Sequence, residues 1–166
     1  MALGNRYKSA VGAGTLAALI LVLVFGSPWY ADWANDDAHT NPATAGGWFL
    51  RLLTWPRWTF NSNDSLREII VGDLKAILLV VLTALFLYML PGSQLARARG
   101  TISQFFAGWA SYIFAGGFAA LLTTLFLKNP SLLGAFQSAG NGAAYGLFVG
   151  WIVGFATLGG YRGTKS

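Results

Sequence analysis

The chain contains no cysteine and only one histidine, His39, among its 166 residues. The lack of cysteine excludes disulfides, thiolate catalysis and any zinc or iron–sulfur centre held by thiolates. A single histidine excludes a haem held by two histidines of this chain. The sequence also lacks the G-x-S-x-G, H-E-x-x-H and phosphate-loop patterns of common catalytic sites. We therefore expect a protein that is not an enzyme and that binds no metal or cofactor.

Charged residues are scarce as well, at 10% of the chain, whereas 55% of the residues are hydrophobic. A typical soluble domain is about 25% charged. So few charges cannot cover a folded core with a wetted surface, so the expected partner is the lipid bilayer. Nucleic acid is not an expected partner despite the net charge of +5, because the basic residues stand singly or in pairs beside apolar runs. The abundance of Ala, Gly and Trp is typical of a bacterial protein.

Four apolar runs predict transmembrane helices in one membrane domain, at about residues 10–27, 69–90, 102–127 and 138–160. A helix needs roughly 20 apolar residues to cross a bilayer. The first run has the basic start of a signal peptide but no small-residue cleavage site, so we expect it to remain as a helix that ends before Pro28. Ser65 and Glu68 form a possible capping box at the start of the second helix.

The segment 28–68 between the first two runs is the predicted outer loop. It is polar, rich in aromatic residues and interrupted by prolines, and a short apolar stretch before Pro56 predicts a helix lying on the membrane surface. Tryptophan prefers the headgroup layer. Five tryptophans of this loop are therefore predicted interfacial anchors: Trp29, Trp33, Trp48, Trp55 and Trp58.

The distribution of charges predicts the orientation in the membrane. All six acidic residues fall in the segments that would lie outside if the N-terminus were inside. Basic residues alone divide six inside to five outside, but the inner ones stand in short segments close to the helix ends, where the positive-inside rule acts. We therefore expect a multi-pass protein of the cell membrane with both termini in the cytoplasm. The inner basic residues are Arg6, Lys8, Arg97, Arg99, Arg162 and Lys165.

The last predicted span carries small residues four positions apart. They are Gly142, Gly146, Gly150 and Gly154, and Ser138 extends the stripe by one turn. Little hydrophobic force acts between helices in lipid, and small residues at this spacing let two backbones approach closely. The stripe predicts a helix–helix contact. The sequence leaves its partner open between the third span, the same helix of another copy, and a different membrane protein.

Gln137, Asn141 and Tyr145 form a second line on the same helix, again four residues apart. One interpretation is a polar path for a transported solute. The other is hydrogen bonding between helices, or proximity to the headgroups, and we favour it because polar side chains commonly join membrane helices.

Asp73 and Lys75 are the ionisable residues closest to the hydrocarbon, near the start of the second span. A charge inside a membrane is a functional hypothesis by default, so Asp73 is a candidate for coupling ion movement. The alternative is that Lys75 extends outward to water and that Asp73 sits among the headgroups. The shallow position of both residues favours this second interpretation.

The acidic part of the outer loop contains Asp32, Asp36 and Asp37, followed by His39. Their spacing fits neither a calcium loop nor a zinc site. We interpret them as a solvated acidic segment that holds no metal.

Together these features predict an all-α integral membrane protein with four transmembrane helices and a short interfacial helix in a Trp-rich outer loop. The function they favour is that of a non-catalytic accessory or structural subunit, which contacts helices of other membrane proteins or of itself. The alternative is a homo-oligomeric channel or small transporter that uses Asp73 or the polar line of the last helix.

Overall fold

The computed structural model describes residues 2–40, 44–58, 66–92, 101–126 and 131–163, and within these ranges it is all-helical, without strands. The prediction of an all-α membrane protein is confirmed. The helices are α1 (Ala2–Phe25), α2 (Pro28–Thr40), α3 (Ala45–Leu53), α4 (Leu66–Gly92), α5 (Thr101–Thr124), α6 (Leu132–Val149) and α7 (Trp151–Gly163). Ser65 and the side chain of Glu68, the predicted capping box, lie outside the described residues.

Three of these helices are long and apolar enough to cross a bilayer, through Lys8–Phe25 of α1, Ile69–Leu90 of α4 and Ile102–Thr124 of α5. A fourth crossing is possible if α6 and α7, which meet at an angle of 53°, form one bent span. The predicted span 138–160 lies within this pair, whose helical structure begins at Leu132.

The bend between α6 and α7 lies at Gly150. Helical hydrogen bonding continues through it, since the Gly150 amide donates to the Gly146 carbonyl at 2.7 Å and the Gly154 amide donates to the Gly150 carbonyl at 2.9 Å. Glycine is among the few residues at which helices bend sharply without losing their path. The bend has a clear consequence for packing: α6 contacts α5 and α3, whereas α7 contacts α5 and α1.

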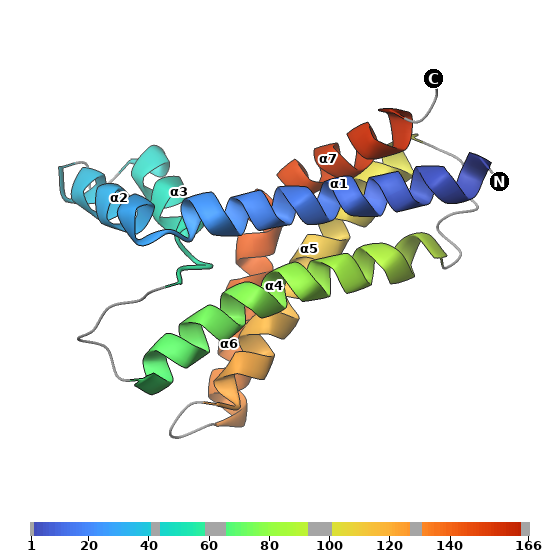
Figure 1. Ribbon diagram of the computed structural model, residues 1–166. Coiled ribbons are helices and arrows are strands. Elements are labelled where there is room, and N and C mark those ends of the chain that lie inside the picture. The colour runs from blue at the N-terminus through green and yellow to red at the C-terminus, as the bar shows by residue number, and fades with distance from the viewer. Residues whose placement is uncertain (1, 41–43, 59–65, 93–100, 127–130, 164–166) are drawn as a thin grey trace.

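Helix α5 is the centre of the bundle and contacts α4, α6 and α7 (Figure 1). Helix α1 lies along α7 and also contacts α4. The start of α1 and the end of α7 lie at the same end of the bundle, and α2 and α3 lie at the opposite end, which we call the α3 end (Figure 1). The fold therefore places the predicted outer loop opposite both termini.

Helix α1 packs closely against α4 and α7 toward the end of the bundle where it begins. A Cβ added to Gly14 of α1 would lie 2.7 Å from a methyl group of Leu87 on α4. A Cβ on Gly160 of α7 would lie 2.6 Å from the Ser9 carbonyl of α1. Toward the α3 end, α1 and α4 are instead separated by an apolar groove that includes Trp58.

Helix α2 was not predicted, because prolines in this segment favoured an irregular loop. The structure shows why a helix begins here. The Ser27 hydroxyl accepts a hydrogen bond from the Tyr30 amide at 3.3 Å and so caps the helix, and Pro28 occupies the first turn, where a proline ring fits. The Tyr30 hydroxyl donates to the Leu50 carbonyl at 3.4 Å, which joins α2 to α3.

Helix α3 occupies the stretch where a short surface helix was predicted. Its first turn is capped by Thr44, whose hydroxyl accepts from the Gly47 amide at 3.1 Å. The chain then turns back to the end of α1, where the Trp58 amide donates to the Gly26 carbonyl and the Trp58 indole donates to the Val22 carbonyl, both at 3.1 Å. These bonds fix the segment 54–58 against the bundle.

Candidate functional site

The four glycines of the predicted stripe all face α5 of the same chain. Their contacts step along the two helices in opposite directions, as in an antiparallel pair. A Cβ on Gly142 would collide with the Gly116 carbonyl, and one on Gly146 would lie 2.6 Å from the Cα of Ile113. A Cβ on Gly150 would lie 2.9 Å from the side chain of Trp109, and one on Gly154 would lie 2.8 Å from the Phe105 carbonyl.

This contact leaves no room for a side chain larger than hydrogen at these positions, since real Cβ atoms do not approach backbone atoms so closely. The backbones of α5 and α6 therefore pack at the distance that small residues allow in membranes. Of the three partners that the sequence left open for the stripe, the third span of the same chain lies against it.

Two tyrosines meet where α5 and α6 pack together. The hydroxyl groups of Tyr112 and Tyr145 lie 3.0 Å apart, and both side chains are fully buried. The Tyr145 ring stacks on Trp55 with ring centres 4.9 Å apart and planes inclined by 20°. Trp55 thus belongs to the packed interior of the α3 end as much as to its surface.

The predicted polar line is divided between two environments. Gln137 and Asn141 are exposed on α6, whereas Tyr145 is fully buried against Tyr112. Ser138, the first member of the small-residue stripe, lies with Asn141 in the wall of a pocket. The three polar residues of the line therefore do not face one common space.

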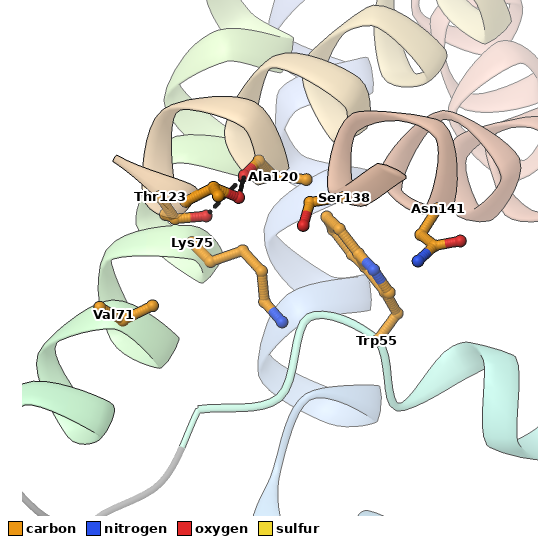
Figure 2. A pocket seen from close by; sticks show the side chains of 8 residues that line it. Trp55, Val71, Lys75, Ala120, Thr123, Ser138 and Asn141 are labelled. Carbon is orange, nitrogen blue, oxygen red and sulfur yellow. Dashed lines mark hydrogen bonds between the residues drawn. The ribbon is translucent and has the colours of Figure 1, made fainter. Parts of the chain in front are cut away.

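This pocket, which we call the Lys75 pocket, has a volume of about 200 Å³ and lies between α4, α5 and α6. Figure 2 shows the Lys75 amine and the Ser138 hydroxyl on one side of the Trp55 ring, and Asn141 on the other side. The Lys75 nitrogen lies 4.8 Å from the centre of a Trp55 ring, within the range of a cation–π interaction. A lysine expected to extend outward instead lies between the helices.

Two threonines of α5 complete the wall. Thr123 donates to the Ala119 carbonyl at 2.8 Å and also contacts the Ala120 carbonyl, to which Thr124 donates at 2.8 Å (Figure 2). Their protons are therefore used within their own helix. No acidic residue of the described part of the chain lines the pocket.

Asp73 lies on a different side of α4 from Lys75. It is half-buried at the groove between α1 and α4, which is otherwise apolar and includes Trp58. The two residues are only two positions apart, so on a helix their side chains point in widely different directions. The structure therefore separates the two charges that the sequence brought together.

The five predicted tryptophan anchors also fall into two groups. Trp29, Trp33 and Trp48 are exposed at the α3 end, Trp29 to 77%. Trp55 and Trp58 are half-buried, one on Tyr145 and the other bonded to α1. Only the first group has the free surface that a headgroup contact requires.

The acidic residues of α2 do not form a site with other ligands. Asp32 and Asp36 are exposed on this helix. The side chains of Asp37 and His39 lie outside the described residues. Among the side chains that the structure describes, no three histidine, aspartate or glutamate residues come together as metal ligands would.

Sequence reasoning missed the pairing of Tyr112 with Tyr145 and the packing role of Trp55. A signal for the first was present, because a tyrosine hydroxyl in the middle of an apolar span needs a partner and the third and fourth runs each hold one. The position of Trp55 depends on how the loop folds back, which no local pattern indicates.

Comparison with known protein families, with curated proteins and with solved structures finds no match for this chain.

Proposed function

We propose that this multi-span membrane protein is a non-catalytic subunit that joins a larger membrane assembly through the outward side of α6. The observation that supports the proposal is a set of three exposed residues on that helix, Gln137, Gly140 and Ala144, spaced three and four residues apart. This spacing places them on one side of the helix. We call this surface the outer α6 face.

The outer α6 face lies opposite the glycine stripe. The stripe is occupied by α5, so a partner protein needs another surface. A Cβ added to Gly140 would meet nothing within 4 Å, which leaves space for the close approach of a second helix. Gln137 has no hydrogen-bond partner among the described residues, and a side-chain amide turned toward lipid is satisfied best by a polar group on a neighbouring helix.

The interior of the bundle supports a structural role over transport within one chain. The hydroxyl groups of Thr83, Ser111 and Thr157 are buried, and each donates to the carbonyl four residues earlier in its own helix at 2.6–2.7 Å. Tyr112 and Tyr145 bond to each other. Because these buried groups are paired locally, they do not themselves offer a row of free polar atoms to an ion or solute.

Site-specific crosslinking tests the proposal. Because the chain has no cysteine of its own, the crosslinker attaches only at the introduced cysteine. Gln137→Cys and Ala144→Cys variants would carry a photo-activated maleimide crosslinker in native membranes. Leu16→Cys on α1, an exposed apolar position on another helix, serves as the matched control. We expect one protein to be captured from both α6 positions and not from Leu16.

Two other outcomes would decide against the proposal. Equal capture from all three positions, or none from α6, would mean that the outer α6 face meets only lipid. A product with twice the mass of the chain would favour the homo-oligomeric channel or transporter.

A further inference from the structure

Several hydrogen-bond donors that line the Lys75 pocket have no acceptor bound to them. The Lys75 amine, the Ser138 hydroxyl, the Asn141 amide and the Trp55 indole all line it, and none has a hydrogen-bond partner among the described residues. The Trp55 ring offers Lys75 its face, which attracts a cation but carries no negative charge. A group of donors around a positive charge, without a carboxylate, has the chemistry of an anion site.

The charge of Lys75 is uncompensated within the described part of the chain, where no carboxylate forms an ion pair with it. A second cation has the same property nearby. The Nε atom of Arg57 is buried without a hydrogen-bond partner. The Arg57 carbonyl approaches Gly72, one helical turn before Lys75, at 3.7 Å from the position of a Cβ. The loop backbone at Arg57 therefore lies beside α4, and Arg57 is a second cation on this loop whose buried nitrogen lacks a partner.

The position of the pocket restricts where the anion comes from. Lys75 follows Ile69, where the apolar window of α4 begins, by six residues, or about 9 Å along the helix. Ser138 follows the first residue of α6, Leu132, by the same number. Side chains in helices lean toward the N-terminus, so that of Lys75 leans toward the start of α4 and those of Ser138 and Asn141 lean toward the start of α6. Lys75 thus lies near one end of a candidate span, from which a lysine can reach the headgroup layer.

We propose that the Lys75 pocket binds an anionic phosphate group, with Lys75 as the counter-charge and Ser138, on the same side of the Trp55 ring, as a hydrogen-bond donor. Lysine binds phosphate as a point charge. At about 200 Å³ the pocket is smaller than the usual site of a drug-sized molecule, and it suits a headgroup or a small phosphate compound. This site and the outer α6 face lie on different sides of α6, so the site does not depend on the proposed assembly.

The experiment uses the full-length chain purified in an uncharged detergent. It would be titrated with short-chain phosphatidylglycerol, with glycerol phosphate and with short-chain diacylglycerol, which has the same chains as the first lipid but no phosphate. Binding would be followed by native mass spectrometry and by the thermal unfolding midpoint. The variants are Lys75→Gln and, as the matched control, Lys8→Gln, which removes an exposed lysine near the start of α1.

We expect a phosphate compound to bind and raise the unfolding midpoint, and diacylglycerol to have no effect. Lys75→Gln should weaken the binding by about 10- to 100-fold, the factor that a charge-assisted hydrogen bond contributes. Lys8→Gln should bind as the unchanged chain does. Binding of phosphatidylglycerol alone would identify a lipid headgroup as the source of the phosphate, and binding of glycerol phosphate would identify a free compound.

Equal binding by Lys75→Gln and Lys8→Gln, or binding of neither phosphate compound, would overturn the proposal. If Lys75→Gln does not fold, Ser138→Ala decides instead, because this change removes one hydroxyl group and adds no bulk. A several-fold loss of binding at an unchanged unfolding midpoint supports the site. Undiminished binding by Ser138→Ala then overturns it.

Discussion

The hydroxyl oxygens of Tyr112 and Tyr145 lie 3.0 Å apart inside the bundle and join α5 to α6. Their contact continues outward, since Tyr145 stacks on Trp55 and Trp55 lies beneath the Lys75 amine. The loop between α3 and α4 is thus connected to the core through a series of ring contacts. A change in the tyrosine pair tests this connection directly.

Removal of one tyrosine hydroxyl should lower the free energy of unfolding by more than half of the amount that removal of both lowers it. In Tyr145→Phe, the Tyr112 hydroxyl remains buried without its partner, so the free energy of unfolding should fall by about 1–2 kcal/mol. The double variant Tyr112→Phe with Tyr145→Phe leaves no orphaned group and should lie well short of the sum of the single effects. Unfolding in mixed micelles measures all three variants. Simple additivity would show that the hydroxyl groups do not act on each other.

Two glycines of α6, two residues apart, should respond in opposite ways to alanine. Gly142→Ala forces a methyl group into the Gly116 carbonyl, and overpacking of this kind costs about 1–3 kcal/mol. Gly140→Ala meets nothing within 4 Å and replaces a poor helix former, so stability should stay the same or rise by up to about 1 kcal/mol. The same micelle assay compares them. Equal effects would contradict the close packing of α5 on α6.

The orientation in the membrane can be tested with reporter fusions. Fusions after Arg99 and after Lys165 should both report cytoplasm, because short basic segments stay inside. A reporter inserted near Asp37 should report the exterior. An exterior signal after Arg99 would contradict the arrangement with four spans and both termini inside.

Asp73→Asn distinguishes the structural role from transport. The change keeps the shape of the side chain and removes its charge at the groove between α1 and α4. For a structural subunit we expect normal expression and the same crosslinked partner, because a half-buried charge near the end of a span contributes little. Flux into reconstituted vesicles is the second measurement. A folded variant that assembles but loses a flux shown by the unchanged chain would favour the transporter.

The long helices were predictable because their cause is local. An uninterrupted apolar run, such as the one from Ala76 to Leu90, has only one low-energy form in a bilayer, since every backbone group must find its partner within the helix. The short helix α3 was predictable from the same kind of pattern. Helix α2 could have been found from Ser27 and Pro28, a cap followed by a proline that fits the first turn.

The Lys75 pocket was not predictable, because it depends on tertiary geometry. Lys75, Trp55 and Ser138 come from three segments that meet only after the loop folds back to α1 and α6 bends away from α7. Nothing in the neighbourhood of Lys75 in the sequence distinguishes a side chain that reaches water from one that lies on an indole ring. The glycine stripe predicted a close helix–helix contact, but only the folded chain shows which helix lies against it.

The bend at Gly150 has a consequence for the contacts of the last two helices. Beyond it, α7 packs against α1 at the end of the bundle where α1 begins, with Gly14 and Gly160 at close approaches. On the other side of the bend, α6 contacts α5 and α3. A straight helix in place of the two could not follow both sets of neighbours, so a change that straightened the chain at Gly150 would separate one half of this pair from the helices that it now contacts.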